Sequence, residues 1–233
     1  MRTRLDMETE LLARLQVANN STMFPSARLT QLIKDAYIWA TTKWIWTDLV
    51  NGKHTSTVAN NEYYDYPEDF RSNTIMRLTV DNVSYDRKNF EDYLAFKERN
   101  PSDQYKMFAS YGRYYFIHPT PTANGVNNIT VWGALKADSL TNATDITIFT
   151  DNKEEGNEAL VRKALSVALV RIDKNLSTAE ETAANEILQK LNFDELAATQ
   201  RDQRIQHPKF LVPDFYAGRY KTSYGNFNFE DVL

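Results

Sequence analysis

Residues 74–86, TIMRLTVDNVSYD, decide the fold class of the middle of this chain. Both halves of the stretch are rich in Ile, Thr, Val and Tyr, which favour β-strands. The halves flank Asp81 and Asn82, residues that tolerate the backbone conformations of a tight turn. The stretch therefore predicts a hairpin with strands over residues 74–80 and 83–86.

A similar composition extends on both sides of this hairpin, over residues 55–149. Further strands are expected over residues 55–59 paired with 62–66, 107–110 paired with 114–118, 129–135 and 146–149. Asn89 is expected to cap a short helix that runs to about Glu98 and covers the sheet. This β-rich region is therefore predicted to be an antiparallel sheet of about five to seven strands with one embedded helix.

Apolar residues recur at helical spacing near both ends of the chain. Four helices are predicted, over residues 2–18, 27–50, 154–175 and 178–205. Ser26 is expected to cap the second helix, and Thr178 with Glu181 forms a capping-box pattern at the fourth. We expect an α+β fold, in which a helical bundle from both chain ends packs with the central sheet in a single domain over residues 1–207.

Three tryptophans lie within the second predicted helix. Trp39, Trp44 and Trp46 cannot all occupy one narrow helix face. Their spacing indicates contacts both with the core and with an interface.

Composition narrows the class of function. The chain has 233 residues, 42% hydrophobic and 25% charged, as in ordinary soluble globular proteins. Its 27 Lys and Arg against 31 Asp and Glu give a formal charge of −4, so no basic field favours nucleic-acid binding. Cysteine is absent, which excludes disulfides and thiolate metal sites. No secretory signal pattern or run of ~18 apolar residues is present, so we expect synthesis in the cytoplasm and no membrane partner.

Residues that commonly carry catalysis or bind metals are scattered. His54, His118 and His207 are far apart, and none has a metal-ligand spacing. Gly52-Lys53 lacks the rest of a phosphate-binding loop, and no nucleophile elbow is present. Neighbouring acids occur at Glu68-Asp69, Glu91-Asp92, Glu154-Glu155 and Glu180-Glu181, where capping and solvation explain them. We therefore expect no enzyme activity and no catalytic, cofactor-binding or metal-binding residues.

The last residues of the sequence, 208–233, form an arm without periodicity but with an unusual number of aromatic residues. These residues are Phe210, Phe215, Tyr216, Tyr220, Tyr224, Phe227 and Phe229. Segments without a fold of their own are usually poor in aromatic residues. The arm therefore either becomes ordered on a partner or folds back over its own domain as a strap.

Several short segments, taken in order, carry a resemblance to a known family. They are residues 63–71 (YYDYPEDFR), the strand pair around Asp81-Asn82, residues 114–121 and residues 125–132, framed by the predicted helices. Over residues 29–172 the chain resembles the head-to-tail adaptor (connector) proteins of tailed phages. Tyr66 departs from that pattern, because a leucine usually stands beside the proline.

The resemblance implies a structural virion protein at the head–tail junction. It implies a homo-oligomeric ring of twelve copies docked on the portal protein, with a central channel through which DNA passes without specific binding. It also implies that the arm reaches between portal subunits, so that its seven aromatic residues become portal-binding anchors. The opposite face of the ring would meet the tail or the next ring protein.

Three other functions fit the same sequence. The first alternative keeps the protein in the virion as a tail-completion or tail-tube ring protein, whose arm would bind a tail component. The aromatic-rich middle is also compatible with a carbohydrate-binding module that acts as a monomer. An enzyme whose site is assembled from scattered residues is the third alternative.

Overall fold

The computed structural model describes residues 1–16, 22–99, 105–150 and 153–206, with side chains to residue 197. It confirms an α+β fold: five α-helices and one 3-10 helix accompany a seven-stranded sheet within the described residues. The chain divides into two compact units, Met1–Leu188 and Gln189–Leu233. The seven aromatic residues of the arm lie outside the described residues.

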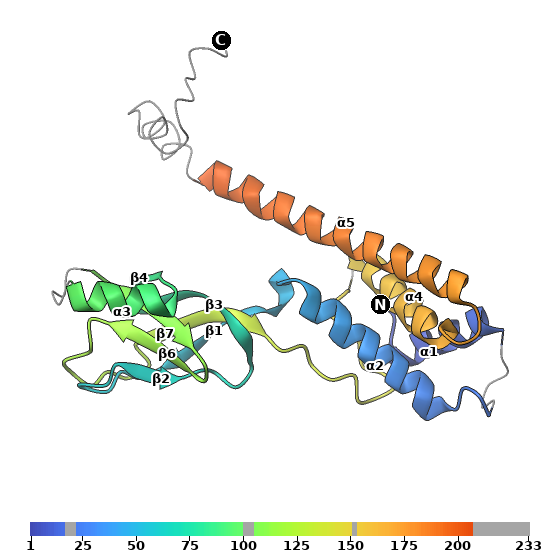
Figure 1. Cartoon of the computed structure of the whole chain (residues 1–233), viewed down its shortest axis with the longest axis horizontal. Helices are drawn as coiled ribbons and strands as arrows, with labels where there is room; N and C mark the ends of the chain where they lie inside the picture. Colours follow the sequence, from blue (N-terminus) through green and yellow to red (C-terminus); the bar gives the residue numbers. More distant parts are fainter. Residues whose placement is uncertain (17–21, 100–104, 151–152, 207–233) are drawn as a thin grey trace, which may run out of the picture. The chain divides into compact units, whose positions relative to one another are not determined.

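Three helices of the first unit pack against one another: α1 (Arg4–Leu15), α2 (Ser26–Lys43) and α4 (Glu155–Leu169) (Figure 1). Helix α1 begins with a capping box in which Thr3 and Asp6 exchange hydrogen bonds. Met7 and Leu11, one turn apart, are fully buried, as the helical periodicity predicts. The first helix is shorter than expected because Gln16 adopts a left-handed conformation (φ 53°) that ends it.

The second predicted helix, 27–50, is too long. Helix α2 ends at Lys43, where Trp44 becomes extended and Trp46 folds back to donate its indole N–H to the Ala40 carbonyl, 2.9 Å away. A 3-10 turn (Thr47–Leu49) and strand β1 (Val50–Thr55) follow. Burial of Trp46 therefore outweighs the helix propensity of the segment. The expected Ser26 cap is also wrong, because the cap position is Pro25 and no side chain caps it.

Arg71, on strand β3, closes the C-terminal end of α2. Its guanidinium donates hydrogen bonds to the carbonyl oxygens of Thr41, Thr42 and Trp44 at 2.9, 2.6 and 2.8 Å. These oxygens belong to the last turn of the helix and the residue after it, where the helix leaves carbonyls unsatisfied. Arg71 thereby joins the helical bundle to the sheet.

Helix α5 (Lys174–Gln206) begins earlier than predicted, and the preceding helix ends earlier, at Leu169. The Asp173 carboxylate caps α5 by accepting from the N–H groups of Asn175 and Leu176, both at 3.0 Å. Thr178 is already inside the helix and donates its hydroxyl to the Lys174 carbonyl at 2.9 Å. The predicted capping box at Thr178 is therefore wrong.

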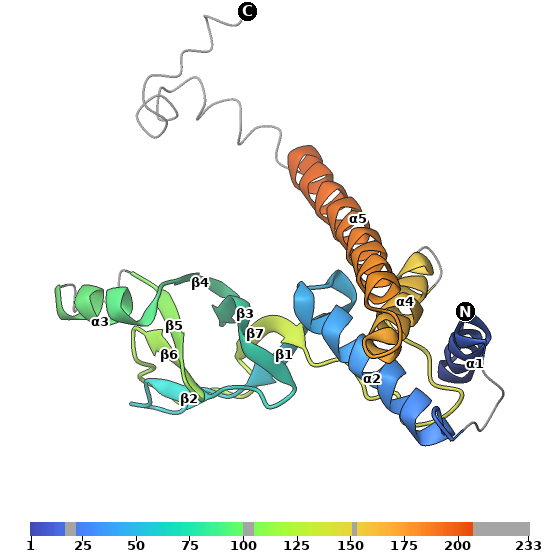
Figure 2. The same ribbon diagram turned by 45° about the vertical axis from the view of Figure 1, so that its right-hand side comes forward.

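The strands form one sheet in the order β1-β7-β3-β4-β5-β6-β2 (Figure 2). After β1 they are β2 (Tyr63–Asp65), β3 (Phe70–Val80), β4 (Val83–Arg87), β5 (Met107–Tyr111), β6 (Tyr114–His118) and β7 (Ile129–Leu135). The sheet is mixed, which corrects the expectation of a purely antiparallel one: β4 and β5 are parallel. Helix α3 (Phe90–Arg99) lies between them in sequence, and parallel neighbours require such a crossover.

Turn chemistry correctly predicted two hairpins and one helix cap. Asp81 and Asn82 join β3 to β4 with positive φ angles of 49° and 64°. Gly112, with φ 59°, joins β5 to β6. Asn89 caps α3 by accepting from the Asp92 N–H at 2.7 Å.

The hairpin predicted for residues 55–66 is wrong. Strand β1 pairs with β7 and strand β2 pairs with β6, at opposite edges of the sheet. Asn60 does adopt a positive φ (62°), but its N–H donates to the Pro121 carbonyl at 2.8 Å, so the connection is tied to a distant loop. A local turn was correctly indicated, yet tertiary contacts decide which strands pair.

The strand predicted for residues 146–149 is also absent. Only an isolated bridge joins Ile146 to Thr3 in this segment. Phe149 is fully buried and packs edge-on against Trp46, with ring centroids 5.1 Å apart. The strands therefore occupy residues 50–135, and residues 140–149 serve the helical bundle.

Both faces of part of the sheet are buried. On the inner face, Tyr64 stacks on Tyr115 at 5.6 Å, within a cluster that includes Phe108. On the other face, Tyr93 of α3 packs on Met107 and Ala109, which confirms that this helix covers the sheet.

Candidate interaction surfaces

Among the described residues, the fold does not bring together the residue types that usually bind metals. His54 lies on β1, with Nδ1 3.1 Å from the Thr130 hydroxyl, whereas His118 is buried on β6. His207 lies outside the described residues. Across the part of the chain that the structure describes, no group of three His, Asp or Glu side chains is suited to a metal ion.

Several of the neighbouring acids have structural partners. Asp69 pairs with Lys53 at 2.8 Å, which lowers the pKa of the Asp69 carboxyl. Glu180 pairs with Arg162 at 2.9 Å, and Glu181 contacts Lys163. These contacts tie strand β1 to residue 69 and helix α4 to helix α5.

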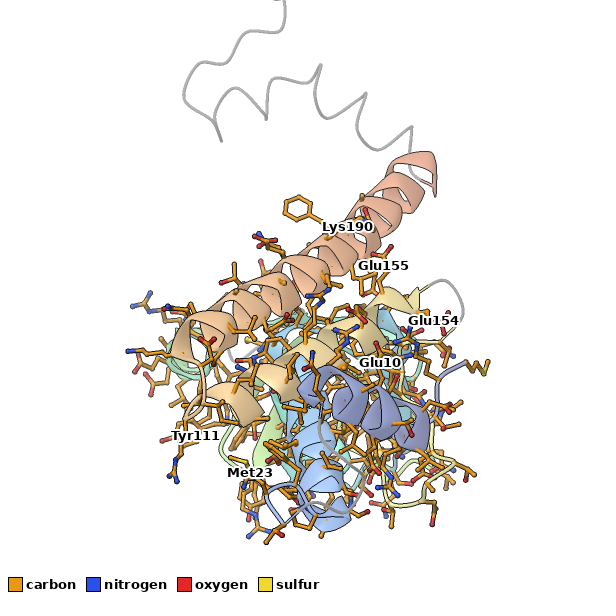
Figure 3. The ribbon with its side chains drawn as sticks, turned by 90° about the vertical axis from the view of Figure 1, so that its right-hand side faces the viewer. Glu10, Met23, Tyr111, Glu154, Glu155 and Lys190 are labelled. Atoms are coloured by element: carbon orange, nitrogen blue, oxygen red, sulfur yellow. The ribbon has the colours of Figure 1, made fainter. Side chains whose placement is uncertain are left out.

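A network of ion pairs joins α1 to α4. Arg14 contacts Glu10 at 2.6 Å and Glu158 at 2.7 Å, and Arg2 contacts Glu10 at 2.7 Å and Glu154 at 3.9 Å. Glu10 and Glu154 lie on the same side of the bundle (Figure 3). Burial raises the pKa of Glu158, but Arg14 and Arg162 outweigh it, so the pKa is lowered overall. The network therefore holds α1 against α4.

The first candidate surface is a band of aromatic side chains over β2, β5, β6 and α3. We call it the aromatic band; it consists of Tyr63, Phe90, Tyr111, Tyr114 and Phe116. The ring centroids of Tyr63 and Tyr114 are 5.4 Å apart, and Phe90 stacks on Tyr111 at 4.4 Å. Tyr63 and Tyr111 are 52% and 62% exposed.

Strand alternation explains how this band arises. On β6, Tyr115 points into the sheet core while Tyr114 and Phe116 point outward. On β2, Tyr64 is inside and Tyr63 outside. The aromatic-rich middle of the sequence therefore supplies both the packed sheet and an exposed platform, two uses that composition alone does not separate.

The second surface lies at the turn between α4 and α5. We call it the turn patch; it consists of Val167, Val170, Ile172 and Leu176, each roughly half exposed. The helical spacing of Leu160, Ala164, Val167, Ala168 and Ile172 in the sequence predicts that Val167 and Ile172 share the buried side of the helix. Ile172 is outside because it follows Leu169, the last residue of α4, whereas Val167 lies within α4 but on its exposed side.

The third surface is the distal part of α5, in the second compact unit. The helix has 33 residues. Ala184 and Leu188, in the first unit, are fully buried, whereas Phe193 and Leu196 beyond them are 65% and 50% exposed. This exposed helical segment leads directly to the aromatic arm.

The three tryptophans of residues 39–46 are divided between the core and the surface. Trp46 is fully buried, whereas Trp39 and Trp44 are partly exposed. The Lys43 ammonium lies 5.1 Å from the Trp39 ring and 4.8 Å from the Trp44 ring, and Lys163 lies 5.1 Å from Trp39. Cation–π contacts thus cover part of the two surface tryptophans.

The fourth surface is a groove between α2 and residues 136–140, the segment that follows β7, and sequence reasoning missed it. We call it the α2 groove. Its walls are formed by Lys34, Tyr37, Ile38, Thr41 and Thr42 of α2, by Arg71, and by residues 136–140. No sequence signal marks it, because its two walls are about a hundred residues apart in the chain.

Comparison of the chain with protein-family models and with curated protein sequences found no match to either. No helix among the described residues combines the length and the apolar character that crossing a membrane requires.

Proposed function

We propose that this protein is a structural virion component, a head-to-tail adaptor that forms an oligomeric ring on the portal protein. The ring extends the DNA channel and offers a platform for the tail. It works by assembly and burial of surface, without turnover. Its location in the virion is the head–tail junction.

The observation that carries this proposal is the long helix α5 with the arm that follows it. The helix exposes Phe193 and Leu196 beyond the residues that pack in the first unit. The arm adds seven aromatic residues, of a type that supplies large contact area at low cost in side-chain entropy. A helix and arm of this kind suit insertion between the subunits of a larger ring.

Two further features support a ring. Cyclic rings of more than two copies need two different patches that meet across each interface. The aromatic band on the sheet and the turn patch on the helices are two such patches, chemically distinct and on separate elements of the first unit. A formal charge of −4 suits a channel wall that does not retain DNA phosphates.

Sedimentation velocity of the full-length protein, alone and with the portal protein encoded by the same genome, tests the proposal. A large complex that forms with the portal is the expected result. Phe193→Asp should weaken this complex, whereas Val58→Asp, at a position of comparable exposure (51% against 65%) in the loop after β1, should not. Persistent monomers that ignore the portal would refute the adaptor function, and binding to a tail component instead would identify a tail-completion ring.

The aromatic band favours one alternative, a carbohydrate-binding surface. Exposed tyrosines that lie side by side on a sheet provide apolar faces on which sugar rings stack. This function needs neither ring formation nor the arm. Glycan binding by a monomer, lost in Tyr63→Ala and Tyr114→Ala and unaffected by deletion of residues 209–233, would favour it over the adaptor function.

A further inference from the structure

The α2 groove has the dimensions of a site for a few side chains. Its cavity volume is about 240 Å³. Pockets for drug-sized ligands are larger, at ~300–1,000 Å³. One wall presents Lys34, Ile38 and Thr42, which lie four residues apart and therefore on one face of α2.

The floor of the groove is apolar toward a ligand. Tyr37, Thr41 and Leu140 are almost completely buried, at 3%, 2% and 2% exposure. Their polar atoms have partners within the protein: Thr41 donates to the Tyr37 carbonyl at 2.8 Å, and the Tyr37 hydroxyl accepts from the Ile148 N–H at 3.3 Å. Burial raises the pKa of Tyr37 to about 12, so its hydroxyl stays neutral at physiological pH. Ile38, by contrast, is 58% exposed at the rim.

The rim carries an excess of positive charge. Lys34, Arg71 and Lys136 face a single carboxylate, Asp138. The Arg71 guanidinium and the Lys136 ammonium contact backbone carbonyls, and among the described residues neither forms an ion pair. The Asp69 carboxylate lies near Lys136, whose charge helps to lower the Asp69 pKa, but it pairs directly with Lys53. An acidic ligand would therefore meet a rim with more cations than carboxylates.

The second wall can receive an extended peptide. Residues 136–139 belong to no helix or strand, and all but Ala137 are exposed. Within the described parts of the chain, the backbone groups of Ala137 and Asp138 form no hydrogen bond to other backbone groups. An extended segment laid along this wall can supply such bonds while its alternate side chains enter the cavity.

One segment of this chain matches these requirements. Residues 226–233, NFNFEDVL, place Phe227 and Phe229 on one face of an extended strand and follow them with Glu230 and Asp231. The earlier part of the arm is unsuitable because it is basic, with Lys209, Arg219 and Lys221 against Asp214. The 21 residues from Gln206 to Phe227 reach about 70 Å when extended. This reach exceeds the length of α5, about 50 Å for its 33 residues, so the arm is long enough to return along its own helix.

We propose that residues 226–233 dock in the α2 groove of their own chain, with the two phenylalanines in the cavity and the two acids against Lys34 and Lys136. The docking does not depend on the adaptor function. If the protein is an adaptor, the groove holds the tip of the arm until a portal subunit displaces it, so assembly would begin with release of this contact.

The absence of cysteine allows a direct test in the full-length protein. Ile38→Cys with Asn228→Cys places one thiol at the groove rim and one between the two phenylalanines. Mild oxidation followed by non-reducing electrophoresis should give an intramolecular disulfide. The matched control is Val126→Cys with Asn228→Cys, because Val126 is 86% exposed and remote in sequence from the groove. If the segment docks, the Ile38→Cys/Asn228→Cys protein should form its disulfide at least about tenfold faster than this control, because docking raises the effective concentration of the two thiols.

Charge reversal adds a second readout. Lys34→Glu with Lys136→Glu should slow the cross-link, and Glu230→Lys with Asp231→Lys in the same chain should restore it. Equal cross-linking rates in the groove and control pairs would overturn the proposal, as would a product made only of dimers, which would place the segment in a neighbouring copy. Circular dichroism confirms that each variant is folded. No portal protein is present, so failure here is distinct from failure of the adaptor function.

Discussion

Removing the Arg71 side chain should destabilise the protein by about 2–4 kcal/mol. The guanidinium makes three hydrogen bonds, of 2.6–2.9 Å, to carbonyls at the end of α2. A hydrogen bond to a charged group contributes about 1.5–3 kcal/mol net, and a cation at a helix C-terminus about 0.3–1 kcal/mol. The three bonds share one side chain and are not additive, and two of the three carbonyls belong to exposed or half-exposed residues that water reaches after truncation. The expected loss therefore lies below the simple sum of the separate contributions, which would be roughly 5 kcal/mol or more.

Urea unfolding at neutral pH measures this effect. The matched control is Arg77→Ala, the same residue type on the same strand, exposed and without a contact of this kind among the described residues. Arg71→Lys should fall between Arg71→Ala and the natural protein, because an ammonium cannot reproduce the fork of the guanidinium. Ordinary surface substitutions change the free energy of unfolding by up to about 0.5 kcal/mol. If the free energies of unfolding of Arg71→Ala and Arg77→Ala differ by no more than this, the reasoning is refuted. A separate early transition would instead show that Arg71 couples the unfolding of the bundle and the sheet.

Further outcomes follow from the packing, the charges and the arm. Phe149→Ala removes a fully buried ring that packs on Trp46, and thermal unfolding should show a loss of about 3–5 kcal/mol; a loss under 1 kcal/mol would contradict the assigned core. Asn82→Val places a β-branched residue at φ 64° and should cost about 1–2 kcal/mol, whereas Asn82→Gly should not destabilise; equal midpoints for both would refute the turn conformation. Because the pKa of Glu158 is lower in the folded protein than its ordinary 4.5, this carboxylate stabilises the fold above pH 4.5 and progressively less as the pH falls below it. The stability difference between the natural protein and Glu158→Gln, measured by urea unfolding, should therefore shrink from pH 7 to pH 3.5, and a constant difference would contradict the ion-pair assignment. Deletion of residues 209–233 should leave a folded, soluble protein that no longer joins the portal; unfolding of this variant would indicate that the arm is part of the core.

Features encoded within a few residues were predictable from the sequence. The turn at Asp81-Asn82, the turn at Gly112 and the Asn89 cap depend on local backbone preferences, and the structure has all three. The helical repeat of α4 likewise predicted that Leu160 and Ala164 are buried. Among the candidate surfaces, the sequence revealed the aromatic content of the middle and of the arm, because composition requires no knowledge of neighbours.

Features that depend on distant partners were not predictable. Asn60-Asn61 correctly marks a turn, but its flanking strands pair with β6 and β7 instead of with each other. Helix α2 stops at Lys43 because Trp46 has a core to enter and Arg71 approaches the freed carbonyls, neither of which is visible in a local pattern.

The sequence by itself therefore determined the α+β class, the helical and β-rich regions, the local turns, the lack of cysteine chemistry and the aromatic arm. Only the tertiary structure decided the strand order, the parallel pair β4–β5, the side of each strand on which a tyrosine lies, and the α2 groove. Local conformational preferences depend on a few residues that are adjacent in the sequence, so they can be inferred from it directly. Strand pairing and grooves depend on which remote surfaces bury each other best, and that balance is reached only when the whole chain has packed.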